Sequence, residues 1–373
     1  MAYKKSETSR MPDLVVTAAV ATLTVVGLIL TFSTSKLVAN GGEVRVVTSH
    51  FQKQFIYAIV GATAYLIAAR MPMSLLRKLA IPALIICTAL LAMVLFSPLG
   101  IKANEATRWL KLGPLRFQPS ELTKLALVIF LADSLARRGA EKMRTLRYGF
   151  IPHLFIAGIP IILVLKEPDL GTAVVLGAIA YAMIFISGAR LKHLLTTALL
   201  AGAVVAVEII RTPYRMARIT AFLHPEENAL GSAFQLTQSK LAFSTGGAWG
   251  VGIGSGQQKL FYLPEAHTDF ILSVWGEEAG LAGTLFILAL FATLTIRGVM
   301  IALKQEDHFT RFLAIGITSW LGLQASINAL VVLGALPTKG LPLPFLSYGG
   351  TGLVACLAAA GLLAGLAPKA VQR

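Results

Sequence analysis

Charged residues are scarce in this chain, at 14% of its 373 residues, against roughly a quarter in an average globular protein. Hydrophobic residues make up 56%. This balance excludes a soluble globular enzyme, a disordered chain and a nucleic-acid-binding domain. The chain has only two cysteines, Cys87 and Cys356. Both lie in apolar runs, so neither a disulfide framework nor a cysteine metal site is expected.

The few charges are mostly positive. Lys and Arg together number 33 against 18 Asp and Glu, a formal charge of +15. In so apolar a chain, this excess indicates cationic loops beside an anionic lipid leaflet. An apolar run over 14–32 follows a basic N-terminus, but no clear small-residue cleavage site follows it. We therefore interpret the run as a retained membrane helix, not as a signal peptide.

The hydropathy pattern predicts an all-α polytopic membrane protein, because a spanning helix needs about 20 mostly apolar residues. We expect about ten transmembrane helices, at 14–34, 52–69, 79–98, 120–136, 150–165, 170–188, 194–211, 268–296, 311–334 and 344–366. They form one membrane domain over 1–373.

The densest basic cluster, from Arg137 to Arg147, should face the cytoplasm. Both termini, 1–13 and 367–373, are then cytoplasmic. One large extracytoplasmic loop, 212–267, joins the seventh and eighth helices, and the 99–119 loop faces outward as well.

The strongest candidate for chemistry is the stretch LPEAHTDF, residues 263–270, which contains His267 and Asp269. We expect Asp269 at the outer start of the eighth helix. An ionised carboxylate there can act as a general base on a substrate hydroxyl. The alternative is structural, because Thr268 and Asp269 are both good helix-capping residues.

Two further polar groups are expected near the outer surface. Glu121 and Lys124 in the stretch QPSELTK share a helix face and can pair. They form either a structural ion pair or part of a cavity that also contains Asp269. In the 99–119 loop, Arg108 precedes Trp109, and an arginine suits the phosphate of a lipid headgroup. An ordinary interfacial loop is the alternative.

Several acidic residues lie within the expected spans. Asp133 can pair with Arg137 at i+4. Glu277 and Glu278 lie about two turns inside the eighth helix, and for them we favour structural pairing over a proton relay.

Glycine and proline mark two irregular segments. The glycines at 246, 247, 250, 252, 254 and 256 match neither a Rossmann fingerprint nor a P-loop, so a tightly turned or flexible loop is expected instead of a phosphate cradle. Three prolines over 336–344 predict an extended or re-entrant entry to the last helix. Such backbone is tolerated at membrane depth only beside protein or a wet cavity.

These motifs together resemble the SEDS family, whose members are the FtsW, RodA and SpoVE type proteins of bacterial cell-wall synthesis. The resemblance rests on 263–280, 118–124, 166–172 and 336–350 and covers nearly the whole chain. The sequences PTKG at 337–340 and PEAH at 264–267 are more similar to the FtsW type than to the RodA type.

The resemblance implies ten membrane helices and a peptidoglycan glycosyltransferase that polymerises lipid II in the bacterial plasma membrane, at the division septum for the FtsW type. It implies a class B penicillin-binding transpeptidase and other division-complex proteins as partners. The family's essential acidic residue matches Asp269, its charged helix pair matches Glu121 and Lys124, and its basic loop residue matches Arg108.

The chemistry fits these residue types. A glycosidase needs a second carboxyl group to protonate its leaving group, whereas a pyrophosphate leaving group needs cations. We expect Asp269 to deprotonate the sugar hydroxyl that attacks the anomeric carbon with inversion. Lys124, oriented by Glu121, should hold pyrophosphate. The further substrate-binding candidates are Arg108, Arg218, His267 and Lys339.

Some alternatives stay open. A divalent cation, Mg²⁺ or Mn²⁺, could share the phosphate charge, although no ligand cluster in the sequence demonstrates one. A lipid II flippase would also suit ten spans with buried charges, but no inverted repeat is evident. A scaffold that only binds other proteins, or a polymerase of the RodA type in cell elongation, are the other possibilities.

Overall fold

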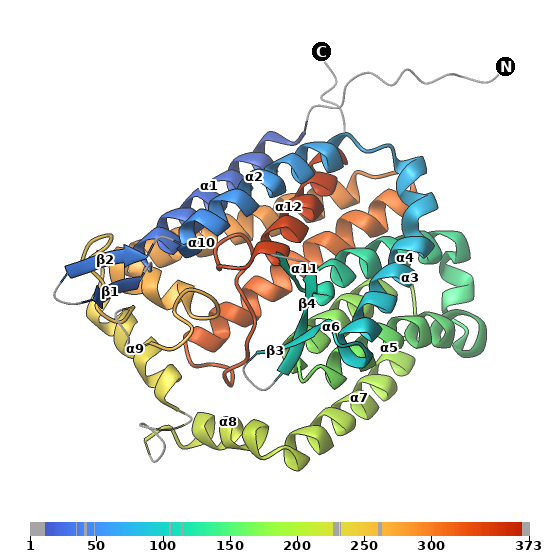
Figure 1. Cartoon of the computed structure of the whole chain (residues 1–373). Coiled ribbons are helices and arrows are strands. Elements are labelled where there is room, and N and C mark those ends of the chain that lie inside the picture. The colour runs from blue at the N-terminus through green and yellow to red at the C-terminus, as the bar shows by residue number, and fades with distance from the viewer. Residues whose placement is uncertain are drawn as a thin grey trace.

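The computed structural model describes residues 12–34, 36–40, 43–47, 49–103, 106–112, 115–226, 231, 233–259 and 263–367. The expected cytoplasmic ends, 1–13 and 367–373, lie almost wholly outside this part. Within it the chain is a bundle of helices with two small sheets (Figure 1). The first and last described segments meet, since the backbone N–H of Asp13 donates to the carbonyl of Ala364 at 3.0 Å.

The helices follow the expected apolar segments closely. They are α1 (Leu14–Ser33), α2 (Ser49–Arg70), α3 (Met73–Phe96), α4 (Pro119–Met143), a π-helical turn η1 (Leu146–Phe150), α5 (Ile151–Lys166), α6 (Leu170–Ile186), α7 (Leu191–Arg211), α8 (Pro213–Leu223), α9 (Phe234–Gly246), α10 (Ile271–Leu303), α11 (His308–Val332) and α12 (Gly350–Gly365). Each of the ten expected spans coincides with one of these helices. Helices α8 and α9 lie in the segment that was expected to be one long loop.

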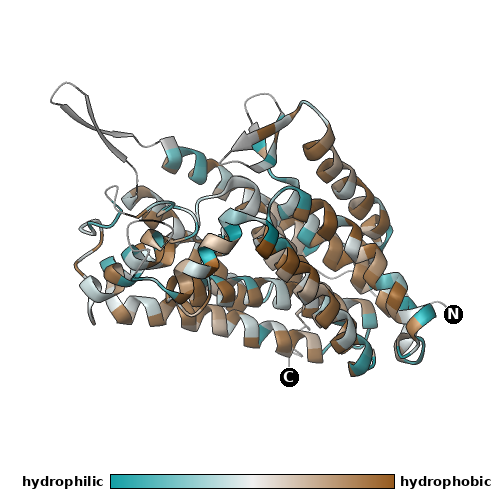
Figure 2. Ribbon diagram, turned by 90° about the horizontal axis from the view of Figure 1, so that it is seen from below, coloured by the Kyte–Doolittle hydropathy of each residue, from teal (hydrophilic) through white to brown (hydrophobic). Residues whose placement is uncertain are grey.

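Six helical stretches within the described residues are long and apolar enough to cross a membrane. They are α1, α3, η1 with α5, α7, α10 and α11. Helices α6 and α12 are apolar but shorter. Helix α4 is less apolar because its first turns carry Glu121 and Lys124 and its last turns are basic. Figure 2 shows apolar residues along most helices, with hydrophilic residues concentrated near helix ends and in loops.

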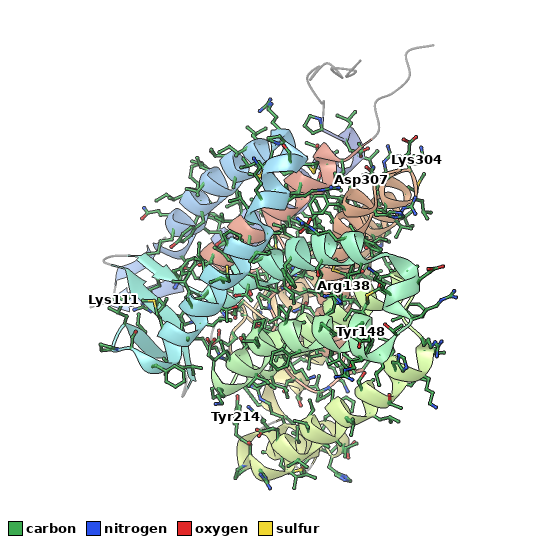
Figure 3. The ribbon with its side chains drawn as sticks, turned by 90° about the vertical axis from the view of Figure 1, so that its right-hand side faces the viewer. Lys111, Arg138, Tyr148, Tyr214, Lys304 and Asp307 are labelled. Carbon is green, nitrogen blue, oxygen red and sulfur yellow. The ribbon has the colours of Figure 1, made fainter. Side chains whose placement is uncertain are left out.

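Two small antiparallel sheets correct the all-α expectation. Strands β1 (Lys36–Asn40) and β2 (Glu43–Val47) form a hairpin. Strands β3 (Gly100–Ala103), β4 (Ala106–Leu112) and β5 (Leu115–Phe117) form a meander in the 99–119 loop. Strands of this length are invisible to a search for apolar runs of about 20 residues. The meander is important because β4 carries Arg108. Figure 3 shows Lys111, from the same strand, on the opposite side of the molecule from Lys304, which follows α10.

The glycine-rich segment is a tightly turned loop, as expected, and it packs against a break in α10. Gly280 has φ +68° and interrupts the helix there. Backbone N–H groups of Val251 and Gly252 donate to the carbonyls of Glu277 and Glu278 at 3.0 Å. The N–H groups of residues 257 and 258 donate to the Glu277 carboxylate. These donors are therefore used within the fold and do not form a phosphate cradle.

The acidic residues within helices are paired, as expected. Lys259 Nζ lies 2.5 Å from Glu278 Oε1, and both side chains are buried. Ser33 at the end of α1 donates to the same carboxylate oxygen at 2.6 Å. Asp133 accepts from Arg137 at 2.9 Å. Glu278 thus joins α1, α10 and the glycine-rich loop into one unit.

The segment between α11 and α12, residues 333–349, is non-helical, as its prolines predicted, and its residues 343–347 are buried in the bundle. Helix α12 begins only at Gly350, six residues later than expected, because Pro342 and Pro344 and the turn around Ser347 keep the chain extended. We call this segment the proline loop. Helix α1 packs closely against it, since a Cβ on Gly27 would lie 2.5 Å from the carbonyl oxygen of Phe345.

Candidate functional site

A cavity of about 890 Å³ lies beside the proline loop. Its walls come from β4, the start of α4, the end of α5, the start of α6, α7, α8, the start of α9, the segment before α10, α11, the proline loop and the start of α12. Five of the seven predicted site residues line it: Arg108, Glu121, Arg218, Asp269 and Lys339. Segments far apart in the sequence thus bring most of the predicted groups into one space.

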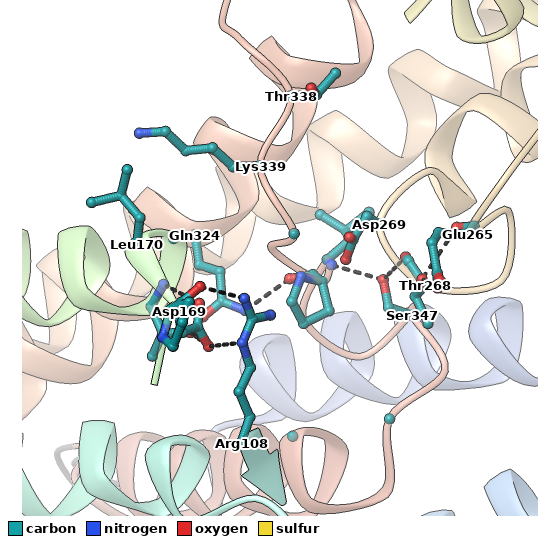
Figure 4. Close-up of a pocket in the computed structure, with 18 of the residues that line it drawn as sticks. Arg108, Asp169, Leu170, Glu265, Thr268, Asp269, Gln324, Thr338, Lys339 and Ser347 are labelled. Atoms are coloured by element: carbon teal, nitrogen blue, oxygen red, sulfur yellow. Dashed lines mark hydrogen bonds and ion pairs between the residues drawn. The ribbon is translucent and has the colours of Figure 1, made fainter. Parts of the chain in front are cut away.

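Asp269 lies on the cavity wall just before α10, and it does not cap that helix. The N-cap is Phe270, which makes no side-chain capping bond. The capping alternative is therefore wrong. Figure 4 shows Asp269 near Thr268 and Ser347, with Arg108 and Asp169 grouped across the cavity. The Asp269 carboxylate faces the proline loop, since a Cβ on Gly340 would lie 3.2 Å from Asp269 Oδ2.

The surroundings of Asp269 shift its titration. Burial, together with the negative charge of Glu265, raises the pKa of Asp269 to about 7. Arg218 acts in the opposite direction. A carboxylate with a pKa near neutral is a stronger base than an ordinary aspartate, and about half of it is ionised at pH 7. This is the property that a general base needs.

Arg108 is held at the cavity rim by the α5–α6 turn. Its Nη2 donates to the carbonyl of Pro168 at 2.5 Å and its Nε to that of Glu167 at 3.3 Å. Its Nε also lies 4.0 Å from Asp169 Oδ2. Asp169 caps α6 by accepting from Thr172. The guanidinium is about one-third exposed, so it is oriented by the protein and open to an anion in the cavity.

Glu167, next to this arginine, is fully buried, and its two carboxyl oxygens have no hydrogen-bond partner among the residues that the structure describes. Burial raises the pKa of Glu167 to about 8, and the neighbouring charge of Asp169 adds to the effect. Glu167 is therefore mostly neutral at pH 7. The net charge of this corner comes from Arg108 and Asp169.

Three more cations line the same cavity. Arg218 on α8 donates to the carbonyl of Thr338 at 3.1 Å and lies over the ring of Tyr214. Lys339 extends from the proline loop, and burial lowers its pKa. Arg215, which was not among the predicted site residues, pairs with Glu208 at 2.9 Å. Arg108, Arg218 and Lys339 thus surround the space that Asp269 faces.

Glu121 and Lys124 pair as predicted, at 2.8 Å, but Lys124 does not line the cavity. Its ammonium group is buried and donates to Gln324 Oε1 at 3.0 Å. Trp320 Nε1 donates to the same oxygen. The structure therefore corrects the expectation that Lys124 holds pyrophosphate directly. Glu121 lines the cavity, and within the described part of the chain its Oε2 has no hydrogen-bond partner.

His267 also differs from its predicted position, because it lies beside the cavity and not in its lining. Its ring contacts those of His50 and Tyr348, with centroids 5.3 and 5.7 Å away. Tyr348 does line the cavity. His267 therefore supports the wall residue Tyr348, and in this position it does not contact the cavity directly.

Three wall residues have strained backbone. Pro168 has φ +30°, Glu265 φ +56° and Phe345 φ +66°, values that non-glycine residues rarely adopt. All three line the cavity. Strain of this kind persists where the surrounding structure fixes the chain, and it concentrates at functional sites.

The sequence interpretation missed two amides on α11. Gln324 and Asn328 are buried, and both bind the proline loop through backbone carbonyls, of Pro342 and Leu341 respectively, at 2.8 Å. They are four residues apart and share a helix face. The sequence signal that could have identified them is the pair of amide residues four positions apart in a mostly apolar span.

No group of three or more His, Cys, Asp or Glu side chains that could hold a metal ion occurs among the residues the structure describes. Mg²⁺ commonly binds through one or two carboxylates together with substrate phosphates. The two cavity carboxylates Asp169 and Asp269 fit that shared mode and do not fit a cage built by protein alone.

The fold and this cavity define a class: a polytopic helical membrane protein with one basic carboxylate facing several cations. The family described as "Cell cycle protein", with FtsW, RodA and SpoVE as its named members, matches residues 13–371. This chain belongs to that family.

Curated relatives agree. A protein of Geobacter sulfurreducens named probable peptidoglycan glycosyltransferase FtsW is 40% identical over 96% of this chain and 95% of that protein. One of Legionella pneumophila with the same name is 41% identical over 92% of this chain and 88% of that protein.

Solved structures agree on the fold. One, described under "Structural coordination of polymerization and crosslinking by a peptidoglycan synthase complex", has a TM-score of 0.76 at 30% identity and covers 94% of this chain and 96% of its own. The rod shape determining protein RodA of Thermus thermophilus has a TM-score of 0.69 at 27% identity and covers 95% and 96%.

Proposed function

We infer that this chain is a peptidoglycan glycosyltransferase of the FtsW type, which polymerises lipid II into glycan strands for septal wall synthesis. The observation that carries this inference is a single basic carboxylate, Asp269, facing a cavity surrounded by Arg108, Arg218 and Lys339. The names of the curated relatives support the same activity.

The reaction follows from these groups. Asp269 removes the proton from a sugar hydroxyl of one substrate, and the resulting oxygen attacks the anomeric carbon of the other. The bond between that carbon and the phosphate oxygen breaks as the new bond forms, so the configuration inverts. The polyprenyl pyrophosphate leaves as an anion, stabilised by Arg108, Arg218 and Lys339. Asp269 keeps the proton until solvent takes it.

Buried Lys124 contributes through its charge and not through contact. It compensates Glu121, so that a carboxylate can line the cavity without repelling the pyrophosphate strongly. If a divalent cation takes part, it would be shared between the substrate phosphates and one or two carboxylates such as Asp169. No step above depends on it.

The placement in the membrane is part of the proposal. Ten helices span the bacterial plasma membrane as a single domain, both termini are cytoplasmic, and the cavity opens to the outer side at the division septum. A class B penicillin-binding transpeptidase would cross-link the strands. One solved chain of similar fold comes from a peptidoglycan synthase complex that coordinates polymerization and crosslinking. This likeness supports such a partner.

A proteoliposome experiment separates this activity from lipid II transport. Fluorescent lipid II is supplied to vesicles that contain the chain and its cognate transpeptidase. We expect glycan strands and equimolar release of the polyprenyl carrier. Movement of intact lipid II across the bilayer without strands would contradict the proposal and favour a flippase.

The pH dependence tests the assignment of the base. The charged groups that face Asp269 are Glu265, Arg218, Asp169 and Arg108. Because the ionised form is the active one, the rate should rise with pH, with a midpoint near the Asp269 pKa of about 7. Glu265→Gln removes a negative charge, lowers that pKa and should move the midpoint to lower pH. An unmoved midpoint would contradict the assignment.

A further inference from the structure

Three consecutive backbone carbonyls, those of residues 267–269, each accept a hydrogen bond from a distant part of the chain. The donors are Tyr348 N at 2.8 Å, Ser347 Oγ at 2.6 Å and Asn328 Nδ2 at 2.8 Å. Only the Asn328 bond reaches Asp269 itself. Its donor, Asn328, lies inside helix α11, whereas the other two donors lie in the proline loop.

Asn328 uses both hydrogens of its amide group. The second one is donated to the carbonyl of Leu341, also at 2.8 Å. Asn328 is only 2% exposed, so no water competes for these bonds. The Asn328 side chain thus joins the backbone of Asp269 to that of Leu341. Leu341 follows Gly340, and the Asp269 carboxylate lies beside Gly340.

The carboxylate of Asp269 accepts no hydrogen bond from any residue that the structure describes, so its direction depends on where its backbone is held. We propose that Asn328 is a positioning residue for Asp269 and fixes the direction in which the base meets the attacking hydroxyl. This inference rests on the proposed glycosyltransferase function. A displacement of about 1 Å in a catalytic group can cost on the order of 100-fold in rate.

Gln54 on α2 provides a matched control. It is a buried amide, 1% exposed, that also makes two hydrogen bonds to the proline loop. Its Nε2 donates to the carbonyl of Ser347, and its Oε1 accepts from the N–H of Gly349, both at 3.2 Å. Gln54→Ala therefore loosens the same loop as Asn328→Ala, but it removes no bond to Asp269.

The experiment compares initial rates of strand formation from labelled lipid II by wild type, Asn328→Ala, Asn328→Leu and Gln54→Ala. Each protein is purified with its transpeptidase and matched for thermal stability. Asn328→Leu removes the amide donors, adds no charge beside Asp269 and nearly keeps the side-chain volume, which guards against the cavity that the alanine variant leaves. We expect both Asn328 variants to lower kcat on the order of 100-fold with KM nearly unchanged, and Gln54→Ala to lose far less.

The other outcomes are distinct. Equal kcat losses in Asn328→Ala and Gln54→Ala would show general loosening of the loop and overturn the positioning role, as would a rise in KM alone. A wild-type chain that makes no strands would contradict the proposed function itself, and with it the premise of this inference.

Discussion

Asp269→Asn should reduce the rate of glycan polymerisation on the order of 1000-fold, the usual contribution of a general base. Asparagine has nearly the shape of aspartate but cannot take a proton from the sugar hydroxyl. The cations Arg108, Arg218 and Lys339 stay in place, so the substrate should bind as before. The loss should therefore appear in kcat and leave KM nearly unchanged.

Asp269→Glu is the natural companion variant. It keeps the carboxylate but moves it by one methylene toward Gly340, where a Cβ would already lie 3.2 Å from the carboxylate oxygen. We expect partial activity, below wild type and well above Asp269→Asn. Wild-type rates from Asp269→Asn, in a preparation with wild-type thermal stability, would remove Asp269 from the mechanism.

Glu121→Ala should destabilise the fold by about 3–5 kcal/mol, because it leaves a buried ammonium without its counter-charge. Lys124 is completely buried, and among the described residues it would keep only uncharged neighbours, Gln324 Oε1 at 3.0 Å and the Trp320 ring at 5.3 Å. The expected result is a large fall in the thermal unfolding temperature in detergent. A variant as stable as wild type would contradict the burial of this pair.

A double variant separates the structural from the functional role of the pair. Glu121→Leu with Lys124→Met replaces two buried charges by apolar groups of similar volume, which commonly restores stability. If the pair serves only the fold, activity should return with stability. We expect a stable protein with little activity, because Glu121 lines the cavity and the Glu121–Lys124 pair carries part of its charge balance.

The helices and most of the site were predictable from the sequence for a physical reason. Burial in lipid demands long apolar runs, so ten expected spans coincide with helices. Arg108, Glu121 and Asp269 stand out because charges near such runs are costly unless a polar cavity receives them. The pairing of Glu121 with Lys124 followed from helix geometry alone.

The rest depended on tertiary packing. The strands of the 99–119 loop are too short to be detected by a hydropathy pattern that finds membrane helices. The burial of Lys124 is decided by Trp320 and Gln324, almost 200 residues further along the chain. The bond from Asn328 to the Asp269 backbone spans 59 positions, and no spacing rule connects residues that far apart.

The most direct test of the central claim is strand formation from labelled lipid II by the purified chain with its cognate transpeptidase. Wild type is compared with Asp269→Ala and Asp269→Asn in equally folded preparations. The account predicts strands from wild type and, from each variant, a rate on the order of 1000-fold lower. Strands at wild-type rates from both variants would contradict it.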